Sequence, residues 1–191
     1  MRTSLASYLD DFRSRGDETA FAHRHGLRLK RWSYSDIAKT ATRFARELEA
    51  RRIQKGDRIL LWGDNSPEWV CGFFGCLPRG VIAVPVDVQS DPGFVKRLQA
   101  QVDAKLALCD TATSSLIDKS LPVIELDELT SQVAHHSSKP YLTTENASDD
   151  TVEIVFTSGT TAEPKGVCIT NRNLMANLTP IELEIKRYLK W

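Results

Sequence analysis

A chain of 191 residues with 41% hydrophobic and 26% charged side chains has the composition of an ordinary globular protein. Its 25 basic and 25 acidic residues give a formal net charge of zero, which argues against a polyanion such as nucleic acid as the partner. The N-terminus lacks the apolar core of a secretory signal, and the most apolar stretch, residues 70–88, is interrupted by Pro78 and Gly80. We therefore expect a cytoplasmic protein without a transmembrane segment, and a peripheral contact with a membrane stays open.

The first two thirds of the chain are expected to alternate helices with strands. A basic run at residues 23–31 indicates an exposed hairpin. Apolar residues at helical spacing, with Ser35 and Ser66 placed as caps, predict helices at 35–53, 66–76, 94–102 and 127–134. Runs of β-branched and apolar residues predict strands at 58–62, 81–86, 105–109 and 121–126. This alternation predicts an α/β fold with an open, mainly parallel sheet and flanking helices.

Residues 135–150 are the best candidate for a linker, because they contain few apolar side chains and several Ser, Thr and Asn. We expect them to separate an α/β N-terminal subdomain, residues 1–134, from a second subdomain that begins with residues 151–191.

The cysteines and histidines give no sign of a metal site. The cysteines form no Cys-x-x-Cys pair, and we interpret all four as buried free thiols in a reducing compartment: Cys71, Cys76, Cys109 and Cys168. The histidines lie in polar stretches without a helix-face spacing, so we assign no metal to them: His23, His25, His135 and His136.

The turn between the last two predicted strands, residues 151–156 and 167–170, has the chemistry of a phosphate-binding loop. Gly159 and Gly166 allow close approach of the backbone, and Lys165 adds a point charge suited to the outer phosphates of a nucleotide. Donor groups that can converge on phosphate oxygens come from Thr157, Ser158, Thr160 and Thr161.

This turn has two other interpretations. A hydrophilic hairpin loop would have the same composition. A Walker A loop is excluded because Pro164 occupies the place of its second glycine. The element after the turn is also predicted to be a strand, so no helix N-terminus is expected to face the phosphate.

The ordered string Thr157-Ser-Gly-Thr-Thr-Ala-Glu-Pro-Lys-Gly166 resembles the signature of the adenylate-forming superfamily, which includes acyl-CoA synthetases and fatty-acyl-AMP ligases. Only Ala162 departs from the family string, which has glycine there. Residues 32–36, 55–59 and 77–87 resemble the segments that open the family's large domain. The resemblance covers residues 33–178 and places this chain in the N-terminal portion of that domain.

The resemblance implies a ligase that uses ATP and Mg²⁺. It activates a carboxylic acid, a fatty acid by our expectation, as acyl-AMP and then transfers the acyl group to a thiol such as CoA. It also implies that Thr157 contacts the Mg²⁺. The chain does not name the acid, and it does not decide between CoA and a carrier-protein thiol.

One departure follows the loop. The family often has a histidine where this chain has Asn171, in Thr170-Asn-Arg-Asn173, which leaves an acyl-pocket role for this position open. A simple helix cap formed by Asn171 or Asn173 is the competing interpretation. Further on, Thr179 to Glu182 predict a capping box that opens a helix with an apolar face on Ile181 and Ile185.

The resemblance also implies a glutamate that binds magnesium, an aspartate that binds the ribose hydroxyls and a lysine on a C-terminal domain, and none of these has a candidate in this sequence. We therefore expect the catalytic residues beyond Trp191 and the isolated chain to be incomplete and inactive. Two alternatives stay open: a non-catalytic binding or assembly module, docking onto a missing C-terminal part or a second copy, and a catalytically silent remnant.

Overall fold

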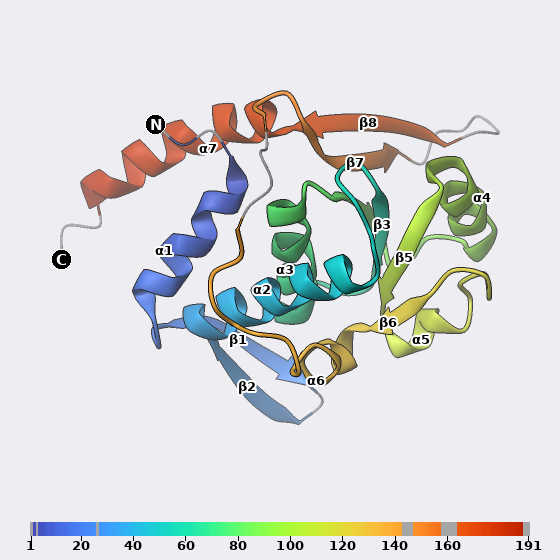
Figure 1. Ribbon diagram of the computed structural model, residues 1–191, viewed down its shortest axis with the longest axis horizontal. Coiled ribbons are helices and arrows are strands. Elements are labelled where there is room, and N and C mark those ends of the chain that lie inside the picture. Colours follow the sequence, from blue (N-terminus) through green and yellow to red (C-terminus); the bar gives the residue numbers. More distant parts are fainter. Residues whose placement is uncertain (1, 3, 26, 143–146, 158–163, 189–191) are drawn as a thin grey trace.

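The computed structural model describes residues 2, 4–25, 27–142, 147–157 and 164–188 (Figure 1). A six-stranded sheet forms its centre, in the order β6-β5-β3-β4-β7-β8. The strands are β3 (Arg58–Trp62), β4 (Ile82–Val86), β5 (Ala104–Cys109), β6 (Val123–Glu125), β7 (Thr151–Thr157) and β8 (Lys165–Thr170). Every neighbouring pair is parallel except β7 and β8, which are antiparallel. The predicted open, mainly parallel sheet is confirmed.

Helices cover both faces of this sheet, with α2 and α3 on one side and α4 and α5 on the other (Figure 1). The helices are α1 (Tyr8–Arg15), α2 (Tyr34–Ala50), α3 (Pro67–Cys76), α4 (Pro92–Val102), α5 (Thr111–Ser114), α6 (Leu129–Gln132) and α7 (Asn171–Tyr188). Short 3-10 turns lie at Leu5–Ser7, Leu77–Arg79 and Leu126–Glu128. The basic run belongs to an antiparallel hairpin, as predicted, formed by β1 (Thr19–His25) and β2 (Arg28–Ser33).

The central strands read as continuous apolar runs because both of their faces are buried. In β3, Ile59 and Leu61 pack with α2 and α3, while Leu60 and Trp62 pack with α4 on the other face. Alternate residues of β4 and β5 divide between the same two clusters. These strands were predictable from the sequence for this reason.

The cap of α2 lies two residues earlier than predicted. Ser33 is extended, and its hydroxyl accepts a hydrogen bond from the Asp36 backbone N–H. The Asp36 carboxylate accepts in return from the Ser33 backbone N–H, at 3.0 Å. The prediction that Ser35 caps this helix is wrong, because this reciprocal box starts the helix at Tyr34.

The helix start predicted at Thr179 is also wrong, because α7 runs unbroken from Asn171 to Tyr188 with Pro180 inside it. The helix starts eight residues before Thr179, at a capping box. There the Thr170 hydroxyl accepts from the Asn173 N–H, and the Asn173 side chain accepts from the Thr170 N–H. Ile181 and Ile185 of the predicted apolar face are exposed.

No helix in the described part of the chain is both long and apolar enough to cross a membrane. β7 joins the same sheet as β4 through a parallel pairing. The division of the chain into residues 1–134, 135–150 and 151–191 stays a prediction.

Candidate functional site

The antiparallel hairpin of β7 and β8 carries the predicted phosphate-binding loop. In its register Thr157 lies opposite Lys165, and Phe156 lies opposite Gly166. The turn residues lie outside the described part of the chain, as does the Thr157 side chain; they include the predicted donors Ser158, Gly159, Thr160 and Thr161. The structure therefore fixes the two ends of the loop, at Thr157 and at Pro164 to Gly166.

The loop follows the carboxyl end of β7. β7 runs parallel to β4, with Glu153 opposite Ala83, so Thr157 lies beyond this pair on its carboxyl side. Ligands of open α/β sheets bind beyond the carboxyl ends of strands, so a loop at the end of β7 suits binding.

Helix α4 holds the second end of the loop. Pro164 is buried, and its carbonyl oxygen accepts a hydrogen bond of 3.2 Å from Nε2 of Gln101, in the last turn of α4. This contact fixes the backbone directly before Lys165. Sequence reasoning missed Gln101, because a single glutamine on an amphipathic helix belongs to no motif.

Lys165 is exposed at the first position of β8. Within the described ranges no carboxylate forms an ion pair with its ammonium group. An exposed ammonium group next to a loop of hydroxyl and glycine residues can bind an anion from solvent.

Close packing also requires a glycine at position 166, apart from its predicted role in phosphate binding. A Cβ atom at this position would lie 2.9 Å from Cζ of Phe156 and 2.9 Å from Cγ2 of Ile154. Both side chains pack against the cluster that α4 forms with the sheet. A larger residue at Gly166 would push them away from that cluster, which links the loop's exit to the core.

Glu153 is a second charged group of this hairpin, in the middle of β7 and partly buried. Burial raises the pKa of its carboxyl above the ordinary value of 4.5. Among the described residues no side chain donates a hydrogen bond to it, so nothing offsets the loss of its hydration.

The two asparagines after β8 do different things. Asn173 takes part in the cap of α7, as one predicted interpretation had it. Asn171 is buried: its Oδ1 accepts from the Leu5 backbone N–H at 3.2 Å, and its Nδ2 donates to the Ala147 carbonyl at 3.4 Å. Asn171 therefore joins the N-terminal segment to the start of α7.

The four cysteines are free thiols, but the prediction that all are buried is wrong for Cys168. This residue lies on β8, at the edge of the sheet, and is exposed. Burial raises the pKa of the other three thiols, Cys71, Cys76 and Cys109. Those three are poor nucleophiles at neutral pH.

A separate groove of about 840 Å³ lies between the β1–β2 hairpin and the carboxyl ends of β3 and β5. Its walls carry both signs of charge, including Arg28, Lys30, Asp64 and Asp110, and Lys30 pairs with Glu68 at 3.3 Å. Since its cations face carboxylates, this groove is a poorer anion site than the end of the β7–β8 hairpin.

Comparison with known proteins gives a family match over nearly the whole chain. The family model described as "AMP-binding enzyme" matches residues 10–190. A fatty acid–[acyl-carrier-protein] ligase, MmaC, of Mycobacterium marinum is 30% identical over 169 residues, 83% of this chain and 32% of the relative. A crotonobetaine/carnitine–CoA ligase of Salmonella paratyphi B is 31% identical over 179 residues, 83% of this chain and 34% of the relative. The chain thus spans about a third of the length of these curated relatives.

Solved structures share the fold. A fatty acyl-adenylate ligase from L. pneumophila, in complex with acyl adenylate and pyrophosphate, matches with a TM-score of 0.80 and 22% identity, over 94% of this chain and 32% of its own. The N-terminal subdomain of Klebsiella oxytoca NpsA matches with a TM-score of 0.72 and 21% identity, over 88% of this chain and 42% of its own.

Proposed function

Because this chain belongs to the AMP-binding enzyme family and matches the N-terminal portion of adenylate-forming enzymes, we propose that its β7–β8 hairpin holds the β- and γ-phosphates of ATP for acyl activation. The observation that carries the proposal is the placement of Lys165 and Gly166 opposite Thr157 and Phe156, at the carboxyl end of β7. The proposed phosphate-binding residues are Thr157, Ser158, Gly159, Thr160, Thr161, Lys165 and Gly166.

In the proposed reaction a carboxylate oxygen attacks the α-phosphorus of ATP. The bond between the α-phosphorus and the bridging oxygen breaks, and pyrophosphate leaves with the electron pair. The sulfur of a thiol, of CoA or of a carrier protein, then attacks the acyl carbon. The bond between that carbon and the phosphate oxygen of AMP breaks, AMP leaves with the electron pair, and the thiol proton passes to solvent. The two relatives are named for a fatty acid and for crotonobetaine and carnitine, which supports a fatty or other carboxylic acid as the substrate class.

The chain's own residues contribute positioning and charge to the first step. Lys165 neutralises charge that develops on the departing pyrophosphate, and the loop's N–H and hydroxyl groups orient its oxygens. Gln101 keeps Pro164, and with it the backbone of Lys165, in place. The hydroxyl of Thr157 is of the hard oxygen type that Mg²⁺ accepts, so this residue would hold the ion that accompanies the phosphates.

The test measures ATP binding by the chain with Lys165→Ala. Loss of a charge-assisted contact costs about 1.5–3 kcal/mol, so we expect roughly ten- to hundredfold weaker binding of ATP and of inorganic tripolyphosphate. Thermal unfolding should change little, because Lys165 is exposed. The matched control is Lys119→Ala, at another exposed lysine, which should bind like the wild type.

Binding is the readout because we also propose that residues 1–191 alone form no acyl-adenylate. Pyrophosphate release with ATP, Mg²⁺ and a panel of fatty acids measures this directly. Robust turnover by the chain would show that our assignment of catalytic roles is wrong. Unchanged ATP binding in Lys165→Ala would count against the phosphate role and favour a non-catalytic module.

A further inference from the structure

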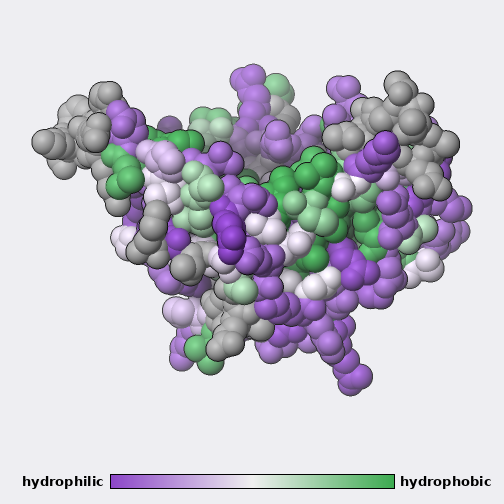
Figure 2. Space-filling model, turned by 90° about the horizontal axis from the view of Figure 1, so that it is seen from above, coloured by the Kyte–Doolittle hydropathy of each residue, from purple (hydrophilic) through white to green (hydrophobic). Residues whose placement is uncertain are grey.

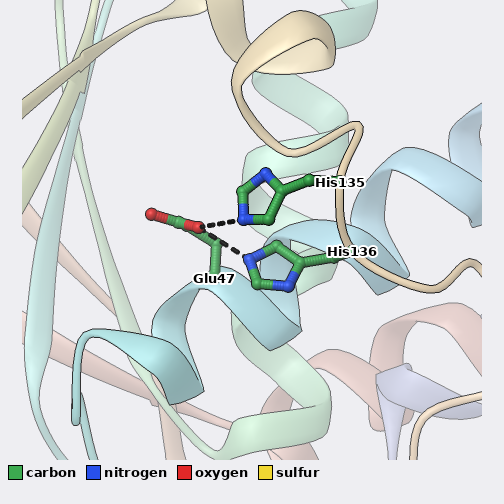
Figure 3. A group of neighbouring side chains, drawn as sticks. All are labelled: Glu47, His135 and His136. Carbon is green, nitrogen blue, oxygen red and sulfur yellow. Dashed lines mark hydrogen bonds and ion pairs between the residues drawn. The ribbon is translucent and has the colours of Figure 1, made fainter.

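Three side chains far apart in the sequence meet outside the nucleotide site. Glu47 lies near the end of α2, while His135 and His136 lie on the turn that follows α6 (Figure 3). Both rings direct Nε2 at the same carboxylate oxygen: His136 Nε2 is 2.7 Å and His135 Nε2 is 3.8 Å from Glu47 Oε2. One ligand atom from each residue lies within 4.8 Å of the others.

We propose that Glu47, His135 and His136 bind one divalent transition-metal ion of the Zn²⁺ type, with water as the fourth ligand. Two imidazoles and one carboxylate form a donor set typical of zinc, and three protein ligands leave one position open. The ion would connect the turn after α6 to helix α2.

The distances are close to those that a metal requires. Bonds of about 2.05 Å in a tetrahedron separate two ligand atoms by about 3.3 Å. His136 Nε2 must therefore move away from Glu47 Oε2 by about 0.6 Å, and His135 Nε2 must approach by about 0.5 Å. Rotation of side chains supplies shifts of this size without moving the backbone.

A hydrogen bond to Glu47 accounts for His136, whereas His135 packs its ring on that of His136, with centroids 3.9 Å apart, and makes no hydrogen bond to Glu47. A neutral imidazole can donate to Glu47 through Nε2 in one tautomer only. Arg51 already donates to the other oxygen of the Glu47 carboxylate. His135 Nε2 lies 3.8 Å from Oε2, which is too far for a hydrogen bond. A cation between the three groups would use both Nε2 lone pairs and the carboxylate at once.

Neighbouring arginines hold Glu47 and the turn that carries the two histidines in place. Arg51 donates from Nε to Glu47 Oε1 at 2.6 Å, which orients the carboxylate and leaves Oε2 for the ion. Arg43 donates to the His136 carbonyl at 3.2 Å, and Arg46 donates to the Pro140 carbonyl at 3.3 Å. These three cations also repel a metal ion, so we expect micromolar rather than nanomolar affinity.

Two of the three side chains are largely buried and the third is exposed, so a metal ion can reach the site from one side. The side chains of Glu47 and His136 are 13% and 16% exposed, while that of His135 is 65% exposed. An ion can enter from the side of His135, and water can occupy the open position there.

The experiment uses tag-free, chelator-treated protein and measures Zn²⁺ binding by titration. We expect one ion per chain, a rise in melting temperature of roughly 5–10 °C when free Zn²⁺ is a hundredfold above the dissociation constant, and visible absorption from Co²⁺ in its place. His135→Gln should weaken binding at least tenfold and abolish the Co²⁺ band, and Glu47→Gln should do the same.

The matched control is His23→Gln, which removes a histidine from the β1–β2 hairpin and should leave zinc binding unchanged. His135 is exposed, so its variant should stay folded, and circular dichroism checks this. Equal zinc uptake by His135→Gln and the wild type, or no uptake by the folded wild type, would overturn the proposal. Neither result bears on ATP, so this test is independent of the proposed nucleotide site.

Discussion

Glu153 links the stability of the sheet to pH. Burial raises the pKa of its carboxyl, so in the folded state the ionised form is disfavoured relative to the unfolded chain. The penalty is absent below the unfolded pKa and complete above the folded one, so it lowers stability at neutral pH.

Glu153→Gln removes this penalty and should raise the free energy of unfolding at pH 7, with no gain at about pH 3. Urea unfolding at both values of pH measures the difference. Asp17→Asn, at an exposed carboxyl, is the control and should change stability at neither pH. A loss of stability in Glu153→Gln at pH 7 would contradict the prediction.

Individual functional residues could be predicted from the sequence only where they belong to a recognisable local motif. Lys165 and Gly166 stand in such an ordered string, and their positions next to β7 follow from two neighbouring β-rich runs. Gln101 and Glu47 carry no such mark, because their partners come from residues 63 and 89 positions away. The spacing of His135 and His136 marks no helix face, so the sequence predicts no metal there, and Glu47, which lies beside them, comes from a distant helix.

At the scale of elements, the contact between α2 and α3 depends on a glycine. A Cβ atom at Gly75 would lie 2.7 Å from Cδ1 of Phe44 and 2.8 Å from the carbonyl oxygen of Ala41. Phe44 is fully buried and the carbonyl belongs to the backbone of α2, so neither can move aside cheaply.

Gly75→Ala should therefore destabilise the fold by about 1–3 kcal/mol, although alanine is the better helix former. Chemical denaturation measures this against Lys39→Ala on the exposed face of α2, which should stay within about 0.5 kcal/mol of the wild type. If Gly75→Ala were as stable as the wild type, the two helices would pack less closely than the structure has them.

Helices and strands with a buried periodic pattern were predicted well. The starts of helices were predicted poorly where two nearby residues could each serve as the N-cap. β3 matches the prediction residue for residue, and α3 starts at its predicted cap, Ser66. Ser33 and Ser35 are both suitable caps by residue type, and the end of β2 at Ser33 decides between them. At Thr179 the local capping signal lost to a helix that had already started eight residues earlier.

For the molecule as a whole, the outer strand of the sheet is exposed. β8 is the last strand in the sheet order, and its Val167 side chain is 55% exposed. Figure 2 looks down on the side where β8 and α7 lie and shows an apolar area near the middle of this face. An exposed edge strand with an apolar side chain is a template for pairing with another chain.

We therefore expect residues 1–191 to self-associate as protein concentration rises, and Val167→Lys to reduce this. Sedimentation velocity over a range of concentrations measures the effect. Leu142→Lys is the control, since Leu142 is 93% exposed but lies in a loop away from any strand. Equal association of both variants would show that β8 is not the contact.

The hydrogen bond between Leu5 and Asn171 has a consequence for the order in which the protein folds. It joins residues 166 positions apart, and Arg2 reaches Glu182 in the same region, at 3.4 Å. At synthesis rates of about 5–20 residues per second, roughly 10–30 seconds separate the appearance of these partners. Leu5 therefore leaves the ribosome well before Asn171 does, and its backbone N–H has to wait for this partner.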